Sequence, residues 1–525
     1  MRRIVTPALA GLLSASSGVA VAELVAAATR PQAGPLVAVG SAVIDATPTP
    51  VKEFAVRTLG TYDKPALLGG IVVVLALFTA TVGVLSVRRR IIAVLGAAIF
   101  GAAGGAAALS RPSAVAADVL PSLAGALIAG AVLLLLLRRY NGASASVPAG
   151  PDAVPAGPDH VGSAAVTPAG RVRGLLDRRS FVGTAVLVAG GTALAGGASG
   201  IVKRARGGAV ARSREAVRLP APADPAKPLP TGTDPGFVTA NADFYRVDTA
   251  LTVPRIDPAN WSLRIHGMVD RETELSFADL LERPLIERDI TLNCVSNEVG
   301  GPYIGTARWL GVPLAPLLRE IGVRPDANQV VARSVEGMTI GTPVETVLDG
   351  RDTMLCVGMN GEPLSLEHGF PVRMLTPGLY GYAGACKWIT EIELTTFDRF
   401  DAYWVRRGWG ARGPVKTASR IDRPEPFAPV KAGRVTVAGV AWAQTRGIAK
   451  VEVRVDDGEW ATAELLPVPS IDTWVQWRHV WAATDGPHTL TVRATDGTGA
   501  VQTDQRATPF PDGATGQHNI TLTVI

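Results

Sequence analysis

The chain has 525 residues, of which 47% are hydrophobic and only 18% are charged, whereas ordinary soluble domains carry about 25% charged residues. Residues 1–210 hold 19 Lys and Arg against 8 Asp and Glu, a balance of +11, and the other 315 hold 32 against 38, a balance of −6. The positive charge therefore belongs to the apolar first part. This argues against nucleic-acid binding, which needs clustered Lys and Arg on a folded domain.

Five stretches of the first part approach or exceed the roughly 20 apolar residues that cross a bilayer. They are residues 8–28, 65–87, 91–109, 119–137 and 181–202. The first contains Glu23, and a signal peptide is its alternative interpretation. Its length favours a span, and an isolated Glu inside a span tends to face other helices. Residues 1–206 are therefore predicted to form a membrane anchor of about five transmembrane helices.

Arginine residues predict the orientation of this anchor, because short cytoplasmic loops collect Lys and Arg. Arg2 and Arg3 precede the first span, Arg88 to Arg90 fill the loop after the second, and six Arg lie between the fourth and fifth. These loops fall on one side, so the residues after 202 are predicted to lie outside the cytoplasm. Five Lys and Arg between residues 203 and 214 disagree with this orientation.

Three segments around the last span have distinctive compositions. Asp177-Arg178-Arg179-Ser180-Phe181 resembles a twin-arginine export signal, although a plain cytoplasmic anchor would need only the charges. Residues 141–170 form a Pro/Ala/Gly/Ser tract that cannot bury a core and are predicted to be a disordered loop. Residues 207–238, with six prolines and spaced charges, are predicted to be a linker.

Two further domains are expected after the linker. Residues 239–409 mix short apolar runs, helix-like segments and turns, which predicts an α+β domain. Residues 410–525 contain runs such as VTVAGVAWA and KVEVRVDDGEW, with alternating polar and apolar residues and Asp-Gly turns. That pattern predicts a β-sandwich.

Cys294 is the first candidate for chemistry. It ends the strand-like run DITLNC and precedes the turn-like segment VSNEVGGP. A free cysteine is most often a buried small hydrophobe. A thiol at a strand end, followed by permissive backbone, can instead present a thiolate to a metal or substrate. Three cysteines in all, at 294, 356 and 386, are too few and too widely spaced for a disulfide framework or a CxxC site.

The second candidate is the run HGFPVRMLTPGLYGY, residues 368–382, which is followed by Cys386-Lys387-Trp388. Arg373 and Lys387 stand 14 residues apart across a Gly- and Tyr-rich loop. They could close over one anion, with Arg providing a planar fork and Lys a point charge. An ordinary loop with exposed charges is the alternative.

These residues resemble a known family. The segments NGEPL (360–364), HGFPVRMLTPGLYGY and KWITEIEL (387–394) are similar to the molybdopterin-binding core of the sulfite oxidase family. DFYRVDT (243–249) and TARWLGV (306–312) match the same core. The β-rich region resembles the immunoglobulin-like dimerisation domain that follows it. The resemblance covers roughly residues 240–510.

The resemblance implies a molybdenum–molybdopterin cofactor and assigns residues to it. Cys294 matches the cysteine whose thiolate ligates molybdenum, and a soft thiolate suits a metal already held by dithiolene sulfurs. Cys294 and Arg246 are thereby catalytic candidates. The cofactor contacts implied are Tyr245, Arg246, Ser334, His368, Arg373, Ala385, Cys386 and Lys387.

One departure from the family pattern concerns the substrate. Sulfite-oxidising members commonly carry Cys-Ala-Gly-Asn-Arg, whereas this chain has Cys294-Val295-Ser296-Asn297-Glu298. A carboxylate in place of a cation disfavours a dianion such as sulfite. Arg308 is the third catalytic candidate, because it could supply the positive charge instead.

The expected protein is a membrane-anchored oxidoreductase of sulfite oxidase type that transfers an oxygen atom to or from a small sulfur-containing or related substrate. CxxCH, flavin and nicotinamide motifs are not found in the sequence, so a separate electron partner is expected, a haem protein or the quinone pool. A homodimer is possible. One alternative is a sulfoxide or nitrate reductase fed by a membrane donor. Another is a non-enzymatic, membrane-tethered adhesion or sensor protein.

Overall fold

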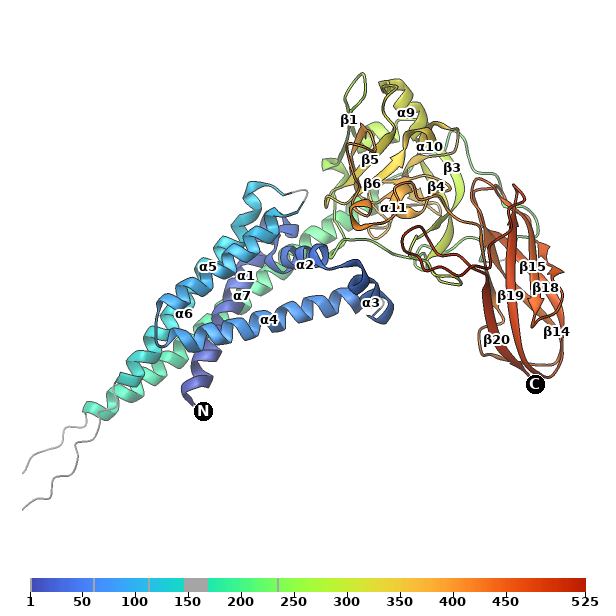
Figure 1. The fold of residues 1–525 in the computed structure, drawn as a ribbon. Coiled ribbons are helices and arrows are strands. Elements are labelled where there is room, and N and C mark those ends of the chain that lie inside the picture. Colours follow the sequence, from blue (N-terminus) through green and yellow to red (C-terminus); the bar gives the residue numbers. More distant parts are fainter. Residues whose placement is uncertain (1, 60–61, 112–113, 146–168, 234–235) are drawn as a thin grey trace, which may run out of the picture. The chain divides into compact units, whose positions relative to one another are not determined.

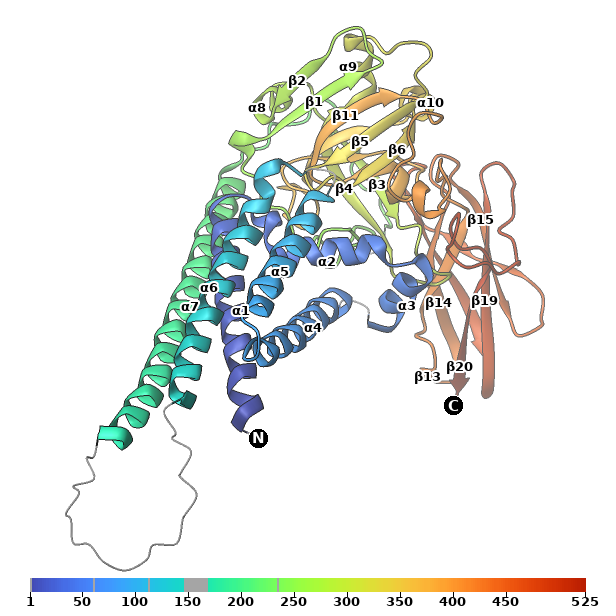
Figure 2. The same cartoon turned by 60° about the vertical axis from the view of Figure 1, so that its left-hand side comes forward.

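The computed structural model describes residues 2–59, 62–111, 114–145, 169–233 and 236–525 (Figure 1). The chain is divided into two compact units. Unit 1 comprises Met1–Gly208 with Ala250–Thr252, and unit 2 comprises Ala209–Thr249 with Val253–Ile525. Figure 2 presents the same elements from a second side.

Unit 1 is helical. Its helices are α1 (Arg2–Ala28), α2 (Pro35–Ala46), α3 (Thr49–Leu59), α4 (Asp63–Ser86), α5 (Ile91–Leu109), α6 (Leu120–Ala145) and most of α7 (Ala169–Ala216). In the described part of the chain, five segments are long and apolar enough to cross a membrane: Ile4–Ala28, Asp63–Ser86, Ile91–Leu109, Ala116–Tyr140 and Phe181–Ala216. Each predicted span coincides with one of them.

Two predictions fall partly or wholly outside the described part of the chain. Residues 146–168 of the predicted disordered loop lie outside it, while 141–145 and 169–170 belong to α6 and α7. The twin-arginine-like residues lie on the α7 backbone, and the side chains of Arg178 and Arg179 are outside the described part.

Small residues allow the helices of unit 1 to approach closely. A Cβ on Gly18 of α1 would lie 2.6 Å from the carbonyl oxygen of Gly125 on α6, and one on Gly11 would lie 2.1 Å from that of Thr79 on α4. Close backbone contact of this kind is the usual packing mode between membrane helices. Glu23 faces a neighbouring helix, as predicted, because its Oε2 lies 2.6 Å from Nζ of Lys203 on α7.

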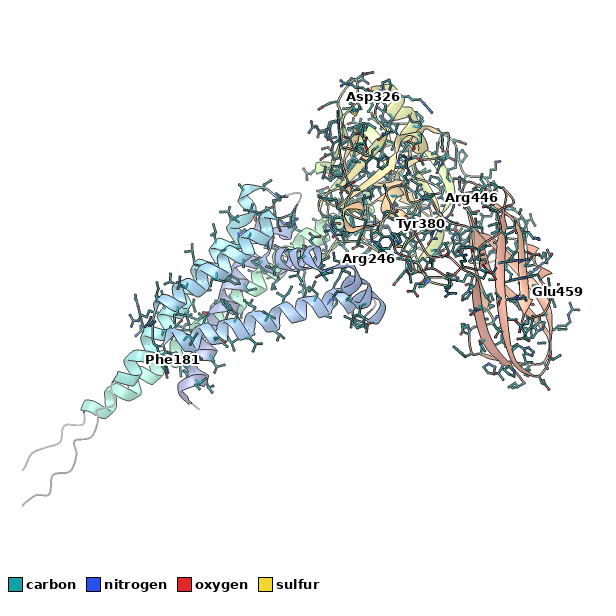
Figure 3. All side chains as sticks on the ribbon, viewed as in Figure 1. Phe181, Arg246, Asp326, Tyr380, Arg446 and Glu459 are labelled. Carbon is teal, nitrogen blue, oxygen red and sulfur yellow. The ribbon has the colours of Figure 1, made fainter. Side chains whose placement is uncertain are left out.

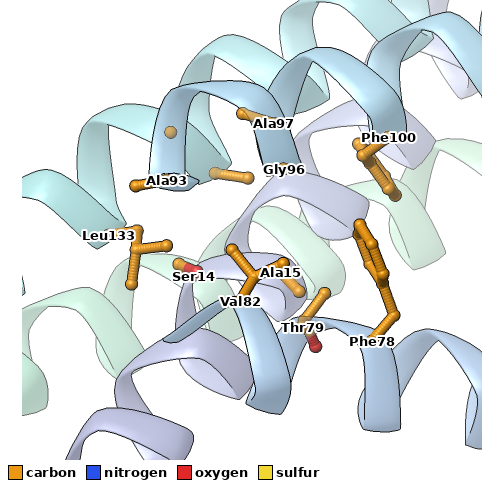
Figure 4. Close-up of a pocket in the computed structure, with 12 residues that line it drawn as sticks. Ser14, Ala15, Phe78, Thr79, Val82, Ala93, Gly96, Ala97, Phe100 and Leu133 are labelled. Carbon is orange, nitrogen blue, oxygen red and sulfur yellow. The ribbon is translucent and has the colours of Figure 1, made fainter. Parts of the chain in front are cut away.

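A small apolar cavity lies between α1, α4, α5 and α6 (Figure 4). Phe78 and Phe100 form part of its wall, and two hydroxyl groups, those of Ser14 and Thr79, border it. Both hydroxyls donate to carbonyl groups of their own helices. They are therefore already engaged in hydrogen bonds.

The first part of unit 2 contains two sheets. One has the order β2 (Thr273–Ser276), β1 (Ser262–Gly267), β11 (Ile389–Thr395), β5 (Gln329–Ser334), β6 (Thr339–Pro343), with β1 and β11 parallel. The other has the order β10 (Ala385–Cys386), β9 (Arg373–Leu375), β7 (Met354–Met359), β4 (Ile304–Pro313), β3 (Ile286–Asn293), and β8 (Glu362–Pro363) pairs with β7. Short helices connect the strands: α8 (Phe277–Leu281), α9 (Leu314–Ile321), α10 (Val344–Leu348) and α11 (Gly381–Gly384). This mixture matches the expected α+β pattern.

Strand β7 is buried on both faces and separates two apolar cores. Leu355 and Val357 join the core that includes α9 and the β1 sheet. Met354 and Cys356 face the opposite way, into a second core with Trp309. Because successive side chains of a strand alternate in direction, and Arg373 is paired with Cys356, the guanidinium enters this second core.

The last part of unit 2 consists of two sheets that share one core. Their orders are β12 (Ala418–Arg423), β14 (Gly433–Trp442), β18 (Val475–Ala483), β17 (Glu464–Leu465), and β13 (Pro429–Val430), β20 (His518–Val524), β19 (Gly486–Asp496), β15 (Ile448–Val455), β16 (Ala461–Thr462). Trp477 and Trp481 lie in the shared core, as their alternation in the sequence suggests. Trp442 and Trp474 instead join a cluster with Tyr380, which Figure 3 labels.

Most of the segment predicted to be a linker, residues 207–238, belongs to unit 2, where residues 209–233 and 236–238 pack. Residues up to Ala216 continue α7, and Val210 joins the core around Trp309. Further on, the Ala223 N–H donates to the Leu285 carbonyl at 2.8 Å, and Phe237 is fully buried. The prolines exclude regular structure there but allow an extended chain to bury its side chains, which composition alone does not reveal.

Candidate functional site

Cys294 lies directly after β3. Its backbone N–H donates to the Tyr303 carbonyl at 3.0 Å, and its Sγ lies 2.9 Å from the Ser296 hydroxyl oxygen. Burial raises the pKa of the thiol, while Ser296 and the charge of Lys387 act in the opposite direction. The thiol is therefore protonated in the protein alone, and a metal ion bound there would convert it to a thiolate.

Arg373 is a buried cation. It is 6% exposed, its Nη1 donates to the His368 carbonyl at 3.3 Å, and its Cζ lies 4.9 Å from the ring centroid of Trp309. Its Nε is buried and, among the described residues, has no hydrogen-bond partner. Burial lowers its pKa. An unpaired buried guanidinium is costly, so this environment favours an anionic ligand.

Two further cations share one carboxylate. Asp248 Oδ2 accepts hydrogen bonds from Lys387 Nζ at 2.8 Å and from Arg246 Nε at 2.9 Å (Figure 3 labels Arg246). Burial lowers the pKa of Lys387 to about 8, although Asp248 partly opposes this. Asp248 thus pairs with two cations, and the charge of Arg373, a third cation, also lowers the pKa of Lys387. Among the described residues, these ion pairs contain more cations than carboxylates once Arg373 is included.

The backbone brings Arg373 and Lys387 together. Strands β9 and β10 pair, with Leu375 opposite Ala385 and Met374 opposite Cys386. Gly369 lies between the two cations at φ +109°, and a Cβ there would be 3.1 Å from Arg373 Cβ and 3.2 Å from Lys387 Cα. Only glycine fits this conformation and this space.

His368 and Tyr245 are neutral hydrogen-bonding groups. His368 Nε2 lies 2.9 Å from the Asn241 carbonyl oxygen, and burial lowers the pKa of His368 to about 4. Because a carbonyl only accepts, Nε2 carries the proton and Nδ1 is an acceptor. Burial first, and Cys294 second, raise the pKa of Tyr245, so its hydroxyl keeps its proton. Its ring stacks on Phe244 with centroids 5.2 Å apart.

The remaining predicted cofactor contacts are Ser334, Ala385 and Cys386, and they differ in the groups available for hydrogen bonding. Ser334 ends β5, and its buried hydroxyl has no hydrogen-bond partner among the described residues. Ala385 and Cys386 form strand β10, and burial raises the pKa of the Cys386 thiol to about 12. Ser334 Oγ and Arg373 Nε are thus two buried groups that a polar, anionic ligand would satisfy. The residues present therefore fit a phosphorylated cofactor.

Arg308 is not brought to Cys294 as a free cation. Its Nε and Nη2 donate to both carboxylate oxygens of Asp289 at 2.9 and 2.8 Å, and Asp289 is 5% exposed. Arg308 on β4 is opposite Asp289 on β3. Asp289 lies five positions before Cys294 in the chain. The charge of Arg308 is neutralised there, which differs from the expectation that it supplies positive charge at the site.

Two polar residues near the site were missed. Asp248 lies in the DFYRVDT segment, and an acid two residues after Arg246 was the available signal. Ser296 follows Cys294 by two positions and contacts its sulfur. A separate set, His266, Glu391 and Glu393, has ligand atoms within 4.8 Å of one another. Arg333 pairs with both carboxylates, so this set forms an ion-pair network.

Comparisons with known proteins identify the family that this chain resembles. A family model described as the oxidoreductase molybdopterin binding domain matches residues 250–404. Mitochondrial sulfite oxidase of Mus musculus is 30% identical over 283 residues, which cover 46% of this chain and 51% of that protein. The uncharacterized oxidoreductase YuiH of Bacillus subtilis (strain 168) is 33% identical over 157 residues, or 30% of this chain and 76% of YuiH.

A third relative carries out a different reaction. Inducible nitrate reductase 2 (NADH) of Glycine max is 33% identical over 216 residues, which cover 36% of this chain and 24% of that protein. The chain spans about half the length of the sulfite oxidases that it matches.

Proposed function

Because the chain belongs to the sulfite oxidase family of molybdopterin-dependent oxidoreductases, we propose that it is a membrane-anchored enzyme that transfers an oxygen atom to or from a small sulfur-containing or related substrate. When bound, the molybdenum–molybdopterin cofactor supplies the two-electron redox chemistry. Family membership makes the chain an oxidoreductase, so the adhesion or sensor alternative is set aside. The observation that carries the proposal is the buried Arg373 beside Lys387, whose Nε has no hydrogen-bond partner among the described residues.

Each residue of the site has a role in this proposal. Cys294 is the protein ligand of the metal. Arg373 and Lys387, with Arg246 at the exposed side, hold the anionic phosphate of the cofactor. Ser334, His368 and Tyr245 orient the cofactor by hydrogen bonds. The backbone of Ala385 and Cys386, paired with β9, positions Lys387 near Arg373.

The substrate depends on the charge around Cys294. Arg308 is neutralised by Asp289, and Glu298 follows in the cysteine loop. A dianion such as sulfite needs positive charge to bind, so this arrangement favours a second candidate function, reduction of a neutral acceptor such as a sulfoxide. Nitrate, the substrate named for the Glycine max relative, is a further candidate.

The cellular arrangement is part of the proposal. The arginine-rich ends of the apolar helices support a cytoplasmic amino terminus and an extracytoplasmic unit 2. A separate haem protein or the quinone pool would exchange electrons with the enzyme. The C-terminal pair of sheets would be an immunoglobulin-like sandwich and would allow a homodimer.

The test is metal analysis followed by a substrate screen. Full-length protein from a host that makes molybdopterin is expected to contain close to one molybdenum per chain. It should turn over one of sulfite, a sulfoxide or nitrate with an artificial electron mediator. Cys294→Ser should retain the pterin and lose turnover. Molybdenum near zero in the wild-type protein would refute the proposal.

A further inference from the structure

We propose that the C-terminal pair of sheets positions the cysteine loop, residues 294–303, through Arg420 and His518. The inference rests on the proposed function in taking Cys294 as the metal ligand. The contacts themselves are between protein groups and do not involve the cofactor, and all of them lie within unit 2.

Arg420 is the first of these positioning residues. It lies on β12, and its Nη1 donates to the Gly301 carbonyl oxygen at 2.8 Å. Its Nε donates to Asp422 Oδ1 at 2.6 Å, and its side chain is 16% exposed. A charged donor on a carbonyl is stronger than a neutral one. Asp422 holds the guanidinium in the direction of the loop.

His518 is the second. Its Nδ1 accepts a hydrogen bond from the Ile421 N–H at 3.0 Å, so in the neutral ring the proton is on Nε2. Its imidazole packs on Gly300, which has φ +79°, and a Cβ on Gly300 would lie 2.3 Å from His518 Nε2. The ring thus occupies the space that a side chain at position 300 would need.

The strand before Cys294 is held from the same pair of sheets. Gln444 Nε2 donates to the Thr291 carbonyl at 3.0 Å, and the Trp474 N–H donates to Thr291 Oγ1 at 2.7 Å. Cys294 therefore lies between two anchored points, Thr291 on one side and the Gly300-Gly301 pair on the other.

Anchoring of the cysteine loop would fix the position of Cys294, the proposed metal ligand. The cysteine loop has no helix or strand of its own before Ile304, and it contains two consecutive glycines. Its order therefore depends on a few hydrogen bonds and on packing. A ligand misplaced by about 1 Å is enough to weaken a site of this kind.

The test uses Arg420→Gln, the conservative Arg420→Lys, and Arg423→Gln as the matched control. Arg423 lies on the same strand, is 67% exposed, and pairs with the exposed Glu425. Hydrogen exchange is measured by mass spectrometry on the full-length protein without cofactor. Arg420→Gln should speed exchange in the peptide covering residues 294–303 by about tenfold to a hundredfold, the range for losing a charged hydrogen bond.

Exchange in residues 448–455 of β15 should not change, Arg420→Lys should recover most of the protection, and Arg423→Gln should resemble wild type. In cofactor-loaded protein, the molybdenum-edge X-ray absorption of Arg420→Gln should show a longer or more disordered metal–sulfur distance.

Wild-type exchange in the cysteine loop of Arg420→Gln would overturn the inference. If β15 also loses protection, Asp422→Asn, which keeps the guanidinium but removes its support, decides the question. It must loosen the loop alone for the inference to stand. A wild-type protein that lacks molybdenum would refute the proposed function and leave the exchange result intact, so the two failures are distinguishable.

Discussion

Arg373 illustrates how a single side chain can indicate a ligand. Its guanidinium is enclosed by Trp309 and the second apolar core, with one hydrogen bond to a carbonyl. An uncompensated buried charge destabilises a protein, and replacing it by an apolar group of similar volume is often neutral or stabilising. Retaining such a group makes sense when a bound anion compensates it.

We therefore predict that Arg373→Met stabilises the protein without cofactor and impairs cofactor retention. Thermal unfolding of the apoprotein should show a gain of about 1 to 4 kcal/mol, and the molybdenum content should fall at least tenfold. Arg264→Met is the control, since Arg264 is 56% exposed and paired with Glu272. A less stable apoprotein with full cofactor content would contradict this prediction.

Arg308 leads to the opposite prediction. Because Asp289 is buried and bound bidentately by Arg308, Arg308→Gln leaves a buried carboxylate without its partner. We expect a loss of about 3 kcal/mol in unfolding free energy with kcat and KM close to wild type. Urea denaturation and steady-state kinetics measure both. A rise of KM by tenfold or more at wild-type stability would restore Arg308 as a substrate contact.

Much of the candidate site could be predicted from short sequence motifs. Arg373 and Lys387 stood in one segment, and their charge and the intervening glycines suggested a shared anion. The ion pairs were not predictable, because Asp248 reaches Lys387 across 139 residues and Asp289 reaches Arg308 through strand pairing. Those contacts depend on the register of the fold.

At the scale of elements, the apolar helices were the most predictable feature. A run of about 20 apolar residues has few alternatives to a span, and each predicted span coincides with a helix. Residues 207–238 were predicted to be a linker. Their prolines exclude regular helix and sheet after Ala216 but do not exclude packing, which Val210 and Ala223 show. The contacts of β12 and β20 with the cysteine loop left no trace in local sequence.

Helix packing in unit 1 is tested by a glycine substitution. Gly18→Val would place methyl groups against the Gly125 backbone of α6, so we expect α1 and α6 to separate and the detergent-solubilised protein to unfold at a lower temperature. Gly69→Val on α4 is the control, because a Cβ there meets nothing within 4 Å. Equal melting temperatures for the two variants would count against the α1–α6 contact.

The stability of unit 2 is expected to depend on pH, because two of its histidines are buried or partly buried. Burial lowers the pKa of both His518 and His368 to about 4, compared with 6.5 for a free histidine. Between these values the unfolded chain binds more protons than the folded one, so stability is complete above about pH 6.5 and falls as the pH drops toward 4.

Urea midpoints measured from pH 7 to 4 should follow this curve. His518→Gln should make it shallower, while His479→Gln, on β18 of the same pair of sheets, should retain it. A midpoint independent of pH in the wild-type protein would contradict the burial of both imidazoles.

For the whole molecule, the account depends on Cys294 being a ligand of molybdenum. X-ray absorption at the molybdenum edge, on full-length protein matured with its cofactor, measures this directly. We predict that Cys294→Ser has one sulfur ligand fewer than wild type while its pterin content is unchanged. An identical number of sulfur ligands in the two proteins would contradict the account.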